Sequence, residues 1–276
     1  MTASNDAPIG VFDSGMGGLT VMRALMARLP DESFVYLGDT ARLPYGTKSG
    51  DTVTRYAVQA ARALAKRRVK LIVIACNTAS AVALPALEAA LAPVPVIGVV
   101  EPGAAAALAA TPNGPIAVLA TEGTVRGGAY LRAIHARNPE VQVVQQACPL
   151  FVPLAEEGLI DHELARGAAR HYLEPLLADV KPGCILLGCT HYPVLGPTIA
   201  AVVGRDIPLV DSAATTAEAV AALLVERGLA RTSGAKPLPN VFLATDAVER
   251  MARVGEIFLG AAIPAQSVEL VDLQEG

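Results

Sequence analysis

Residues 71–79 (LIVIACNTA) and residues 184–192 (CILLGCTHY) follow one pattern. Each segment begins with a mostly apolar run of the length of a buried strand, and then passes through a small residue and a cysteine into polar residues. The two cysteines, Cys76 and Cys189, are 113 positions apart (189 minus 76). The pattern predicts that one strand-and-loop unit occurs twice in the chain.

A second pair of segments keeps the same spacing. VPVIGVVEP and IPLVDSAA are both apolar strand patterns with proline in second place, and these prolines, Pro95 and Pro208, are again 113 positions apart (208 minus 95). Residues 9–15 (IGVFDSG) match residues 116–123 (IAVLATEG) more loosely, at an offset of 107 (116 minus 9). Chance similarity between short apolar strands is the alternative, but it does not account for two pairs at one offset. We therefore expect two halves of similar topology.

Short apolar runs alternate with longer segments of helical periodicity along the rest of the chain. Such alternation is typical of α/β proteins, whose parallel sheets are covered by helices on both faces. The segment after Cys76 predicts a further helix that Pro85 kinks or splits. The expected strands are residues 8–12, 33–37, 71–75, 94–99, 115–119, 141–145, 184–187, 207–210, 241–244 and 268–271, and the other expected helices are residues 19–29, 51–68, 124–136 and 161–177.

The repeat also predicts the domain organisation. We expect two similar α/β domains with mostly parallel sheets, related by a pseudo-twofold axis, with the active site in the cleft between them. The first domain comprises residues 1–98 plus 210–276, because the chain left over after the second half returns to it. The second domain comprises residues 99–209.

The composition excludes several classes of protein. The chain has 276 residues, of which 53% are hydrophobic and 17% charged, with a formal net charge of −4. It can bury a large core, which excludes intrinsic disorder, and it has no basic excess for dedicated nucleic-acid binding. The mean hydropathy of +0.44 is high. The apolar run 94–110 is nevertheless interrupted by Pro95, Glu101 and Pro102, so we expect no membrane span.

The cysteines are expected to be free thiols. The opening segment MTASNDAPIG lacks the basic stretch and apolar run of a secretory signal, so the expected compartment is the cytoplasm, where thiols stay reduced. Cys148 and Cys184 are expected to be buried small apolar residues. The other two, Cys76 and Cys189, occupy equivalent places in the two halves.

Polar side chains collect where the predicted strands end. In open parallel sheets, ligands bind beyond the carboxyl ends of the strands. The residues at these ends are Asp13, Ser14, Cys76, Asn77, Thr78, Thr121, Cys189, Thr190 and His191.

Two thiols on opposite sides of one cleft suit the inversion of a stereocentre by proton transfer. One base removes a proton from one face, and a chemically similar partner delivers a proton to the other. A thiol qualifies, because its ordinary pKa of about 8.5 makes both forms accessible near neutral pH. Asp13 and Glu156 are candidate proton acceptors, and His191 lies two residues from Cys189.

Other kinds of site have weaker support. The glycine loop at residues 15–18 (GMGG) opens a helix as a phosphate loop would, but it is not GxGxxG, no GK[ST] follows, and Asp13 would repel a phosphate. No CxxC or HExxH occurs, so no metal site is expected. His135, His162 and His171 fall in helical stretches and are expected to be surface or packing residues. No lysine follows a strand as a pyridoxal Schiff base would require, so no cofactor is expected.

Five segments together resemble the glutamate racemases of the aspartate/glutamate racemase family. They occur in that family's order between about residues 11 and 211, and GCTHYP with ACNTAS is the most specific pair. The segments are FDSGMGG (12–18), PYG (44–46), ACNTAS (75–80), ACPLFVPLAEEG (147–158) and GCTHYP (188–193).

The resemblance implies a cofactor-independent interconversion of L- and D-glutamate, which supplies D-glutamate for peptidoglycan, and a homodimer. It implies that Cys76 and Cys189 are the catalytic thiols. Asp13 would assist Cys76, and Glu156 and His191 would assist Cys189. The residues implied to bind the substrate are Asp13, Ser14, Tyr45, Gly46, Asn77, Thr78, Thr121, Thr190 and His191.

Two alternatives stay open at this stage. One is a racemase of aspartate or another amino acid on the same scaffold, since only the room around the side-chain carboxylate would differ. The other is a two-domain protein of the periplasmic type that binds an amino acid without reacting. One departure from the family pattern also stands out, because many members carry serine where Gly127 stands, and this concerns a local contact at a helix start.

Overall fold

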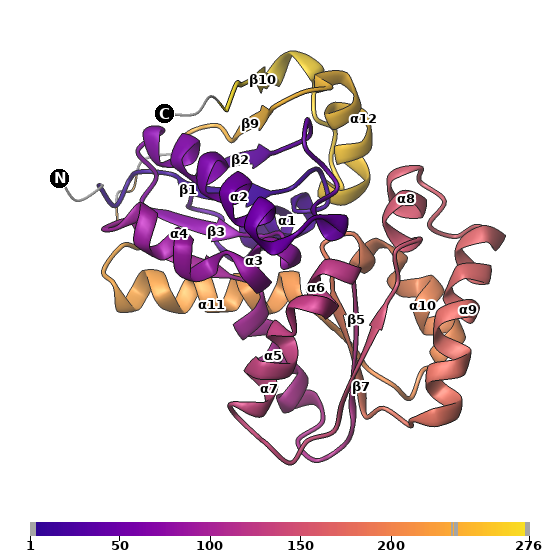
Figure 1. The fold of residues 1–276 in the computed structure, drawn as a ribbon. Helices are drawn as coiled ribbons and strands as arrows, with labels where there is room; N and C mark the ends of the chain where they lie inside the picture. The colour runs from indigo at the N-terminus through magenta and orange to yellow at the C-terminus, as the bar shows by residue number, and fades with distance from the viewer. Residues whose placement is uncertain (1–3, 233, 235–236, 274–276) are drawn as a thin grey trace.

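The computed structural model describes residues 4–232, 234 and 237–273 of the chain. Its strands form one sheet of six and one of four, and the recorded strand pairs are parallel. We call the six-stranded sheet with its helices the larger lobe, and the four-stranded sheet with its helices the smaller lobe (Figure 1). The expected α/β class, with two parallel sheets flanked by helices, is confirmed.

The larger sheet combines strands from the beginning and the end of the chain. Their order across the sheet is β10-β9-β2-β1-β3-β4. The strands are β1 (Ile9–Asp13), β2 (Phe34–Gly38), β3 (Leu71–Ile74), β4 (Val96–Gly98), β9 (Val241–Ala244) and β10 (Val268–Leu270).

The smaller sheet repeats the order of the four N-terminal strands. It has the order β6-β5-β7-β8, which matches β2-β1-β3-β4 strand for strand. The strands are β5 (Ile116–Ala120), β6 (Val143–Ala147), β7 (Cys184–Gly188) and β8 (Leu209–Asp211).

The strand registers also repeat at the offsets found in the sequence. Ile9 of β1 lies opposite Leu71 of β3, and Ile116 of β5 lies opposite Cys184 of β7. The offset is 107 for the first strand of each pair (116 minus 9) and 113 for the second (184 minus 71). The internal repeat is therefore a repeat of hydrogen-bonded register, and it places residues 76 and 189 at equivalent strand ends.

Helices cover both faces of the larger sheet because alternate strand residues point to opposite sides. The side chains of Ile9 and Val11 pack with α1, α11 and α12, whereas Phe12 packs with α2, α3 and α4. These helices are α1 (Leu19–Arg28), α2 (Gly50–Lys66), α3 (Asn77–Val82), α4 (Leu84–Leu91), α11 (Ser212–Glu226) and α12 (Val248–Leu259).

The smaller sheet is covered in the same way. Ile116 and Val118 pack with α5 and α7, whereas Ala117 and Leu119 pack with α8, α9 and α10 in a core that continues into the larger lobe. Among the described helices, none is both long and apolar enough to cross a membrane. The remaining helices are α5 (Val100–Ala110), α6 (Glu122–Gly127), α7 (Ala129–His135), α8 (Phe151–Glu156), α9 (Glu163–Asp179) and α10 (Gly196–Val203), with 3₁₀ turns η1 (Tyr45–Thr47), η2 (Tyr192–Leu195) and η3 (Ala265–Ser267).

After β8 the chain runs back to the larger lobe. Helix α11 packs along α1, and the chain then contributes β9, α12 and β10 (Figure 1). Strand β8 ends at Asp211, so the smaller sheet includes residues 209–211. The division of the chain into domains at residues 98/99 and 209/210 stays a prediction.

Some elements differ from the expectations. Residues 124–136 do not form one helix: α6 ends where Gly128 adopts φ +61°, and α7 begins at the next residue. Glycine takes this left-handed conformation without the steric cost of a Cβ atom, so it ends a helix readily. The break near Pro85 is confirmed, because α3 and α4 meet there. Strand β6 lies two residues later than expected, at residues 143–147.

Candidate active site

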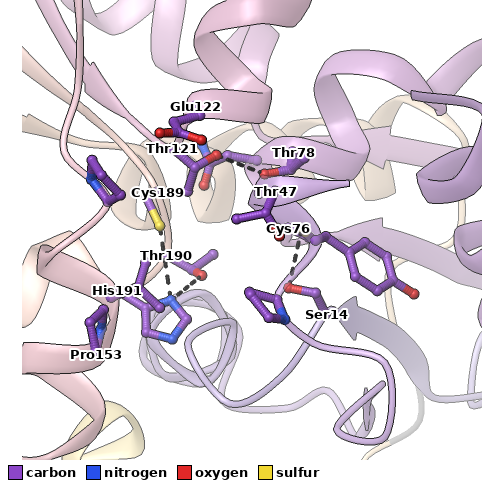
Figure 2. Close-up of a pocket in the computed structure, with 16 residues that line it drawn as sticks. Ser14, Thr47, Cys76, Thr78, Thr121, Glu122, Pro153, Cys189, Thr190 and His191 are labelled. Atoms are coloured by element: carbon purple, nitrogen blue, oxygen red, sulfur yellow. Dashed lines mark hydrogen bonds between the residues drawn. The ribbon is translucent and has the colours of Figure 1, made fainter. Parts of the chain in front are cut away.

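A cavity of about 130 Å³ lies between the lobes, where the carboxyl ends of strands from both sheets meet (Figure 2). The residues that line it follow β1, β2 and β3 in the larger lobe and β5, β6 and β7 in the smaller lobe. Ten residues that the sequence predicts for the site line this cavity. They are Ser14, Tyr45, Gly46, Cys76, Asn77, Thr78, Thr121, Cys189, Thr190 and His191.

Two predicted site residues, Asp13 and Glu156, are not among those that line the cavity. Six lining residues were not predicted. Five of them lie inside segments quoted in the sequence analysis, and Thr47 directly follows one, so membership of these segments was the available signal. The six residues are Pro44, Thr47, Glu122, Pro149, Val152 and Pro153.

Cys76 stands at the junction between β3 and α3. Its Sγ accepts a hydrogen bond from the backbone N–H of Ala79 as the N-cap of α3, and its thiol donates to Ser14 Oγ; both distances are 3.5 Å. Only 4% of the residue is exposed. Burial, together with the nearby charge of Asp13, raises the pKa of the Cys76 thiol to about 12. Cys76 is therefore a protonated thiol at neutral pH.

Asp13 lies behind Cys76 at the end of β1. It is fully buried, and its Oδ2 accepts a hydrogen bond of 3.0 Å from the Gly15 N–H. Burial raises the pKa of Asp13, against the opposing influence of His191 and of backbone N–H groups. Its Oδ1 is buried and makes no hydrogen bond with any residue that the structure describes. Asp13 thus places close to the Cys76 thiol a carboxyl oxygen, Oδ1, that has no hydrogen-bond donor among the described residues.

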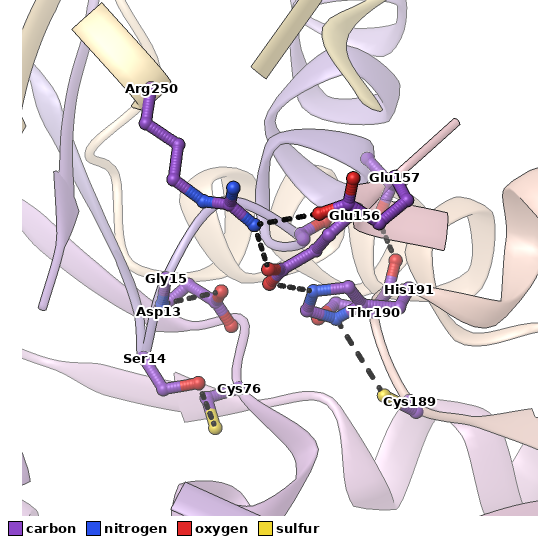
Figure 3. Close-up of polar contacts among 12 residues, drawn as sticks. Asp13, Ser14, Gly15, Cys76, Glu156, Glu157, Cys189, Thr190, His191 and Arg250 are labelled. Atoms are coloured by element: carbon purple, nitrogen blue, oxygen red, sulfur yellow. Dashed lines mark hydrogen bonds and ion pairs between the residues drawn. The ribbon is translucent and has the colours of Figure 1, made fainter. Parts of the chain in front are cut away.

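Cys189 lies on the opposite side of the cavity with a different set of partners (Figure 3). Its Sγ is 3.9 Å from His191 Nδ1, and His191 Nε2 is 3.1 Å from Glu156 Oε1. Burial alone would lower the pKa of His191, but hydrogen bonds to Cys189 and Glu156 outweigh it and raise the pKa. His191 is therefore arranged to hold a proton next to Cys189.

Glu156 is held as a carboxylate. Burial favours its neutral form, but hydrogen bonds from His191 and Arg250 lower its pKa below the ordinary value. Arg250 Nη2 lies 3.0 Å from Glu156 Oε2. Glu156 therefore reaches the cavity only through His191.

The glycine loop has a packing role in this site. A methyl group added at Gly17 would lie within 2.6 Å of Thr190 Oγ1 and even closer to His191 Nδ1, so only glycine allows this approach. The same segment is fastened to the smaller lobe by the hydroxyl of Thr20, which donates to the Thr190 carbonyl at 3.0 Å. These contacts explain the glycine at position 17 by packing alone.

Hydroxyl groups from both lobes meet on another wall. Thr78 Oγ1 in the larger lobe lies 3.0 Å from Thr121 Oγ1 and 3.2 Å from Thr124 Oγ1 in the smaller lobe. Asn77 donates through Nδ2 to the Tyr130 hydroxyl at 2.7 Å. Its Oδ1 is buried and has no hydrogen-bond partner within the described ranges. This wall therefore offers hydroxyl groups to a polar ligand.

The wall formed by Tyr45 and Gly46 is fixed from behind. The Tyr45 hydroxyl donates to Asp39 Oδ2, and its ring packs against Phe12 and Tyr56 with centroid distances of 6.2 and 5.9 Å. Asp39 is fully buried and also accepts from Arg42 Nε at 2.7 Å. The hydroxyl of Tyr45 is therefore already engaged, and its position depends on Asp39.

The structure also locates the cysteines and histidines that were predicted to have no catalytic role. Cys148 and Cys184 are buried, as expected. His135 ends α7, His162 is the N-cap of α9, and His171 lies within α9. Across residues 4–232, 234 and 237–273, no group of three or more His, Cys, Asp or Glu side chains is arranged to hold a metal ion.

The raised pKa of Cys76 predicts slow alkylation. Between a pKa of about 12 and an ordinary value of about 8.5, the thiolate fraction at pH 8 falls roughly a thousandfold. We expect iodoacetamide to modify Cys76 at least about 100-fold more slowly in the folded protein than in urea. The folded-state rate should still rise with pH between 8 and 10, where an ordinary thiol levels off. Peptide mass spectrometry over time measures both rates, and a plateau near pH 9 in the folded protein would contradict the assignment.

Comparison with known proteins gives a consistent result. The model of the Asp/Glu/hydantoin racemase family matches residues 9–220. A glutamate racemase from Geobacter metallireducens is 50% identical over 255 residues, which cover 92% of this chain and 93% of that protein.

Solved structures agree with this match. A Francisella tularensis glutamate racemase in complex with D-glutamate has a TM-score of 0.90 at 37% identity, covering 98% of each chain. A Thermus thermophilus glutamate racemase in complex with beta-chloro-D-alanine has a TM-score of 0.86 at 44% identity, again covering 98% of each chain.

Proposed function

The chain belongs to the Asp/Glu/hydantoin racemase family, and on that premise we propose that it interconverts L- and D-glutamate without a cofactor. The observation that carries the mechanism is the pair of thiols: Cys76 and Cys189 stand at equivalent strand ends of two repeated sheets and line one cavity. Each thiol has its own proton-handling neighbours. This is the arrangement that inversion by two bases requires.

The resting enzyme is already asymmetric. Cys76 holds its proton because burial raises its pKa, whereas Cys189 has His191 beside it to take up a proton. In one direction, the Cys189 thiolate removes the α-proton, the Cα–H bond breaks, and its electron pair stays on the substrate. The Cys76 thiol then delivers its proton to the opposite face of Cα, which inverts the centre. The reverse direction starts from a Cys76 thiolate and a protonated Cys189.

The α-proton of an unactivated amino acid is very weakly acidic. The site must therefore favour the thiolate form of the base and stabilise the negative charge that develops on the substrate. The substrate's α-ammonium group brings a positive charge close to both sulfurs and favours their thiolate forms. The hydroxyls of Thr78 and Thr121 can donate to a carboxylate that gains negative charge as the proton leaves. Thr78 is buried, so a hydrogen bond from its hydroxyl acts in a medium of lower dielectric than bulk water.

The roles of the other site residues are inferred from the groups that they contact. Asp13 assists Cys76 as a nearby acceptor, while His191, fixed by Glu156, assists Cys189. Asn77 lines the cavity and is proposed to contact the α-ammonium group. The residues proposed to bind the substrate all line the cavity, whereas Asp13, which was also expected to bind it, does not and acts through Cys76. They are Ser14, Tyr45, Gly46, Asn77, Thr78, Thr121, Thr190 and His191.

Incubation in deuterated water tests the two-base mechanism. With L-glutamate as substrate, deuterium should appear at Cα of the D product before it appears in the remaining L substrate, because separate bases act on opposite faces. The same order should hold when D-glutamate is supplied. Chiral chromatography with mass spectrometry measures both pools. Binding of glutamate without any deuterium at Cα would instead support a non-reacting binding protein.

Aspartate is the second candidate substrate, since the same thiols would act on it and only the room around the distal carboxylate differs. Parallel assays with L-glutamate and L-aspartate, followed by circular dichroism, separate the two. A larger kcat/KM for aspartate would overturn the substrate assignment and leave the mechanism intact.

The cellular role follows from the product. D-glutamate is a building block of bacterial peptidoglycan, so the enzyme supplies cell-wall synthesis. We place the reaction in the cytoplasm, because both thiols must stay reduced to exchange protons. We also propose a homodimer, which sedimentation at micromolar protein concentration would test.

A further inference from the structure

Helix α12 of the larger lobe contacts the proton-handling residues of the smaller lobe (Figure 3). Arg250, near the start of α12, places Nη2 3.0 Å from Glu156 Oε2 and 3.7 Å from Glu157 Oε1. The sequence shows no motif around Arg250. The contact was therefore not foreseen, and it joins residues that are 94 positions apart.

Glu156 depends on this contact for half of its hydrogen bonding. Its two oxygens have one recorded partner each, His191 at Oε1 and Arg250 at Oε2. The Glu156 side chain is 10% exposed and that of Arg250 is 38% exposed. Loss of the guanidinium would leave a mostly buried carboxylate oxygen without a partner, and such a group rotates or takes up a proton.

The same helix also holds the imidazole ring. Phe258 is fully buried, and its ring lies edge-on to His191 with centroids 5.0 Å apart and planes at 73°. Helix α12 thus contacts His191 directly through Phe258 and indirectly through Arg250 and Glu156. A ring held at its edge and at Nε2 presents Nδ1 to Cys189 in a single orientation.

We propose that Arg250 is a positioning residue for the proton transfer at Cys189: it fixes the Glu156 carboxylate and thereby the orientation of His191. The proposal rests on the two-base function above. Arg250 does not line the cavity, so it acts through Glu156 and does not touch the substrate. Cys76 has a separate set of contacts, with Ser14 and Ala79, that does not involve Arg250.

Thermodynamics limits how such a one-sided role can be detected. Enantiomers have equal free energies, so the equilibrium constant is 1 and kcat/KM is equal in both directions for every variant. Arg250→Ala should therefore lower kcat/KM by about 10- to 100-fold in both directions alike, as a misplaced catalytic group does. The side on which Arg250 acts is visible only in isotope effects.

The decisive measurement uses glutamate deuterated at Cα, supplied as each enantiomer in turn. In Arg250→Ala, transfer at Cys189 becomes the slower step. The substrate isotope effect on kcat/KM should increase in the direction in which Cys189 removes the deuteron, and should decrease in the other direction towards the equilibrium isotope effect of the first transfer. Exchange of the α-hydrogen in Cys76→Ala, where Cys189 is the remaining thiol, shows which enantiomer Cys189 deprotonates.

Two further variants control for general damage. Arg250→Lys keeps a cation near Glu156 and should recover at least a third of wild-type kcat/KM, as an estimate for a point charge in place of the planar fork. Arg253→Ala removes an exposed arginine of the same helix and should leave both the rate and the isotope effects unchanged. Unfolding temperatures of all variants report on the fold.

The outcomes are distinct. If Arg250→Ala loses activity while both isotope effects keep their wild-type values, Arg250 supports the fold and not the Cys189 step, and the proposal is wrong. The same holds if Arg250→Ala keeps full activity. Failure of the wild-type protein and of Arg253→Ala to racemise glutamate would instead overturn the proposed function itself.

Discussion

Replacement of either Cys76 or Cys189 by alanine is expected to lower kcat/KM for glutamate racemisation by about 10⁴-fold or more. Each alanine removes the thiol that is proposed to exchange a proton with Cα on its side of the cavity. Neither Asp13 nor Glu156 lines the cavity, so neither carboxylate can take over. The two losses should be similar in size, because inversion needs both faces.

The reaction is followed in both directions by the circular dichroism signal of glutamate, which has opposite sign for the two enantiomers. Cys184→Ala is the matched control: this buried thiol lies at the start of β7, the strand that precedes Cys189, and donates to the Ala107 carbonyl at 3.6 Å. We expect the control to keep at least half of the wild-type rate and to lose roughly 1 kcal/mol of stability. Full activity in either Cys76→Ala or Cys189→Ala would refute the two-thiol mechanism.

Gly17→Ala is expected to lower kcat/KM by about 100-fold or more, although it changes no polar group of the site. The added methyl group would collide with the His191 ring and with Thr190 Oγ1. Because those groups are packed from behind, the loop at residues 15–18 or the His191 ring must move. A shift of about 1 Å at the Cys189 side is enough for a loss of this size.

Gly167→Ala provides the control for Gly17→Ala. Gly167 lies in α9, where an added methyl group meets no atom within 4 Å. This variant should be as active as the wild type and more stable by about 0.5–1 kcal/mol, because alanine is the better helix former. Steady-state kinetics and thermal unfolding of both variants test the pair. If Gly17→Ala keeps the wild-type rate, the close approach of the loop to His191 is not needed for catalysis.

The repeat, the fold class and most of the cavity lining could be predicted from the sequence. The repeat could be recognised because buried parallel strands have sequences that are short apolar runs. It could also be recognised because the two halves keep the same strand register, which preserves the sequence offset. The site residues stand next to those runs, so ten of the predicted ones line the cavity.

What could not be predicted depends on contacts between distant segments. Arg250 carries no local signal, and its importance arises only because α12 packs against the smaller lobe. Asp39 was missed for a different reason: it lies only six positions before Tyr45, but no motif marks it, and the loop conformation that brings its carboxylate to the Tyr45 hydroxyl is not written in the local sequence. The break at Gly128 was missed although two glycines, Gly127 and Gly128, are adjacent there: glycine is compatible with either a continuous or a broken helix, and only the φ value of Gly128 distinguishes the two cases.

The return of the chain to the larger lobe has a consequence for biosynthesis. All four strands of the smaller sheet lie within residues 116–211, so that sheet can form as soon as this stretch has left the ribosome. The larger sheet cannot be completed at that point, because β2 pairs with β9 on one side. Strands β9 and β10 follow the other eight strands in the chain and are therefore translated after them. Until they arrive, β2 exposes an unpaired apolar edge on the nascent chain, which is where premature association between growing chains would begin.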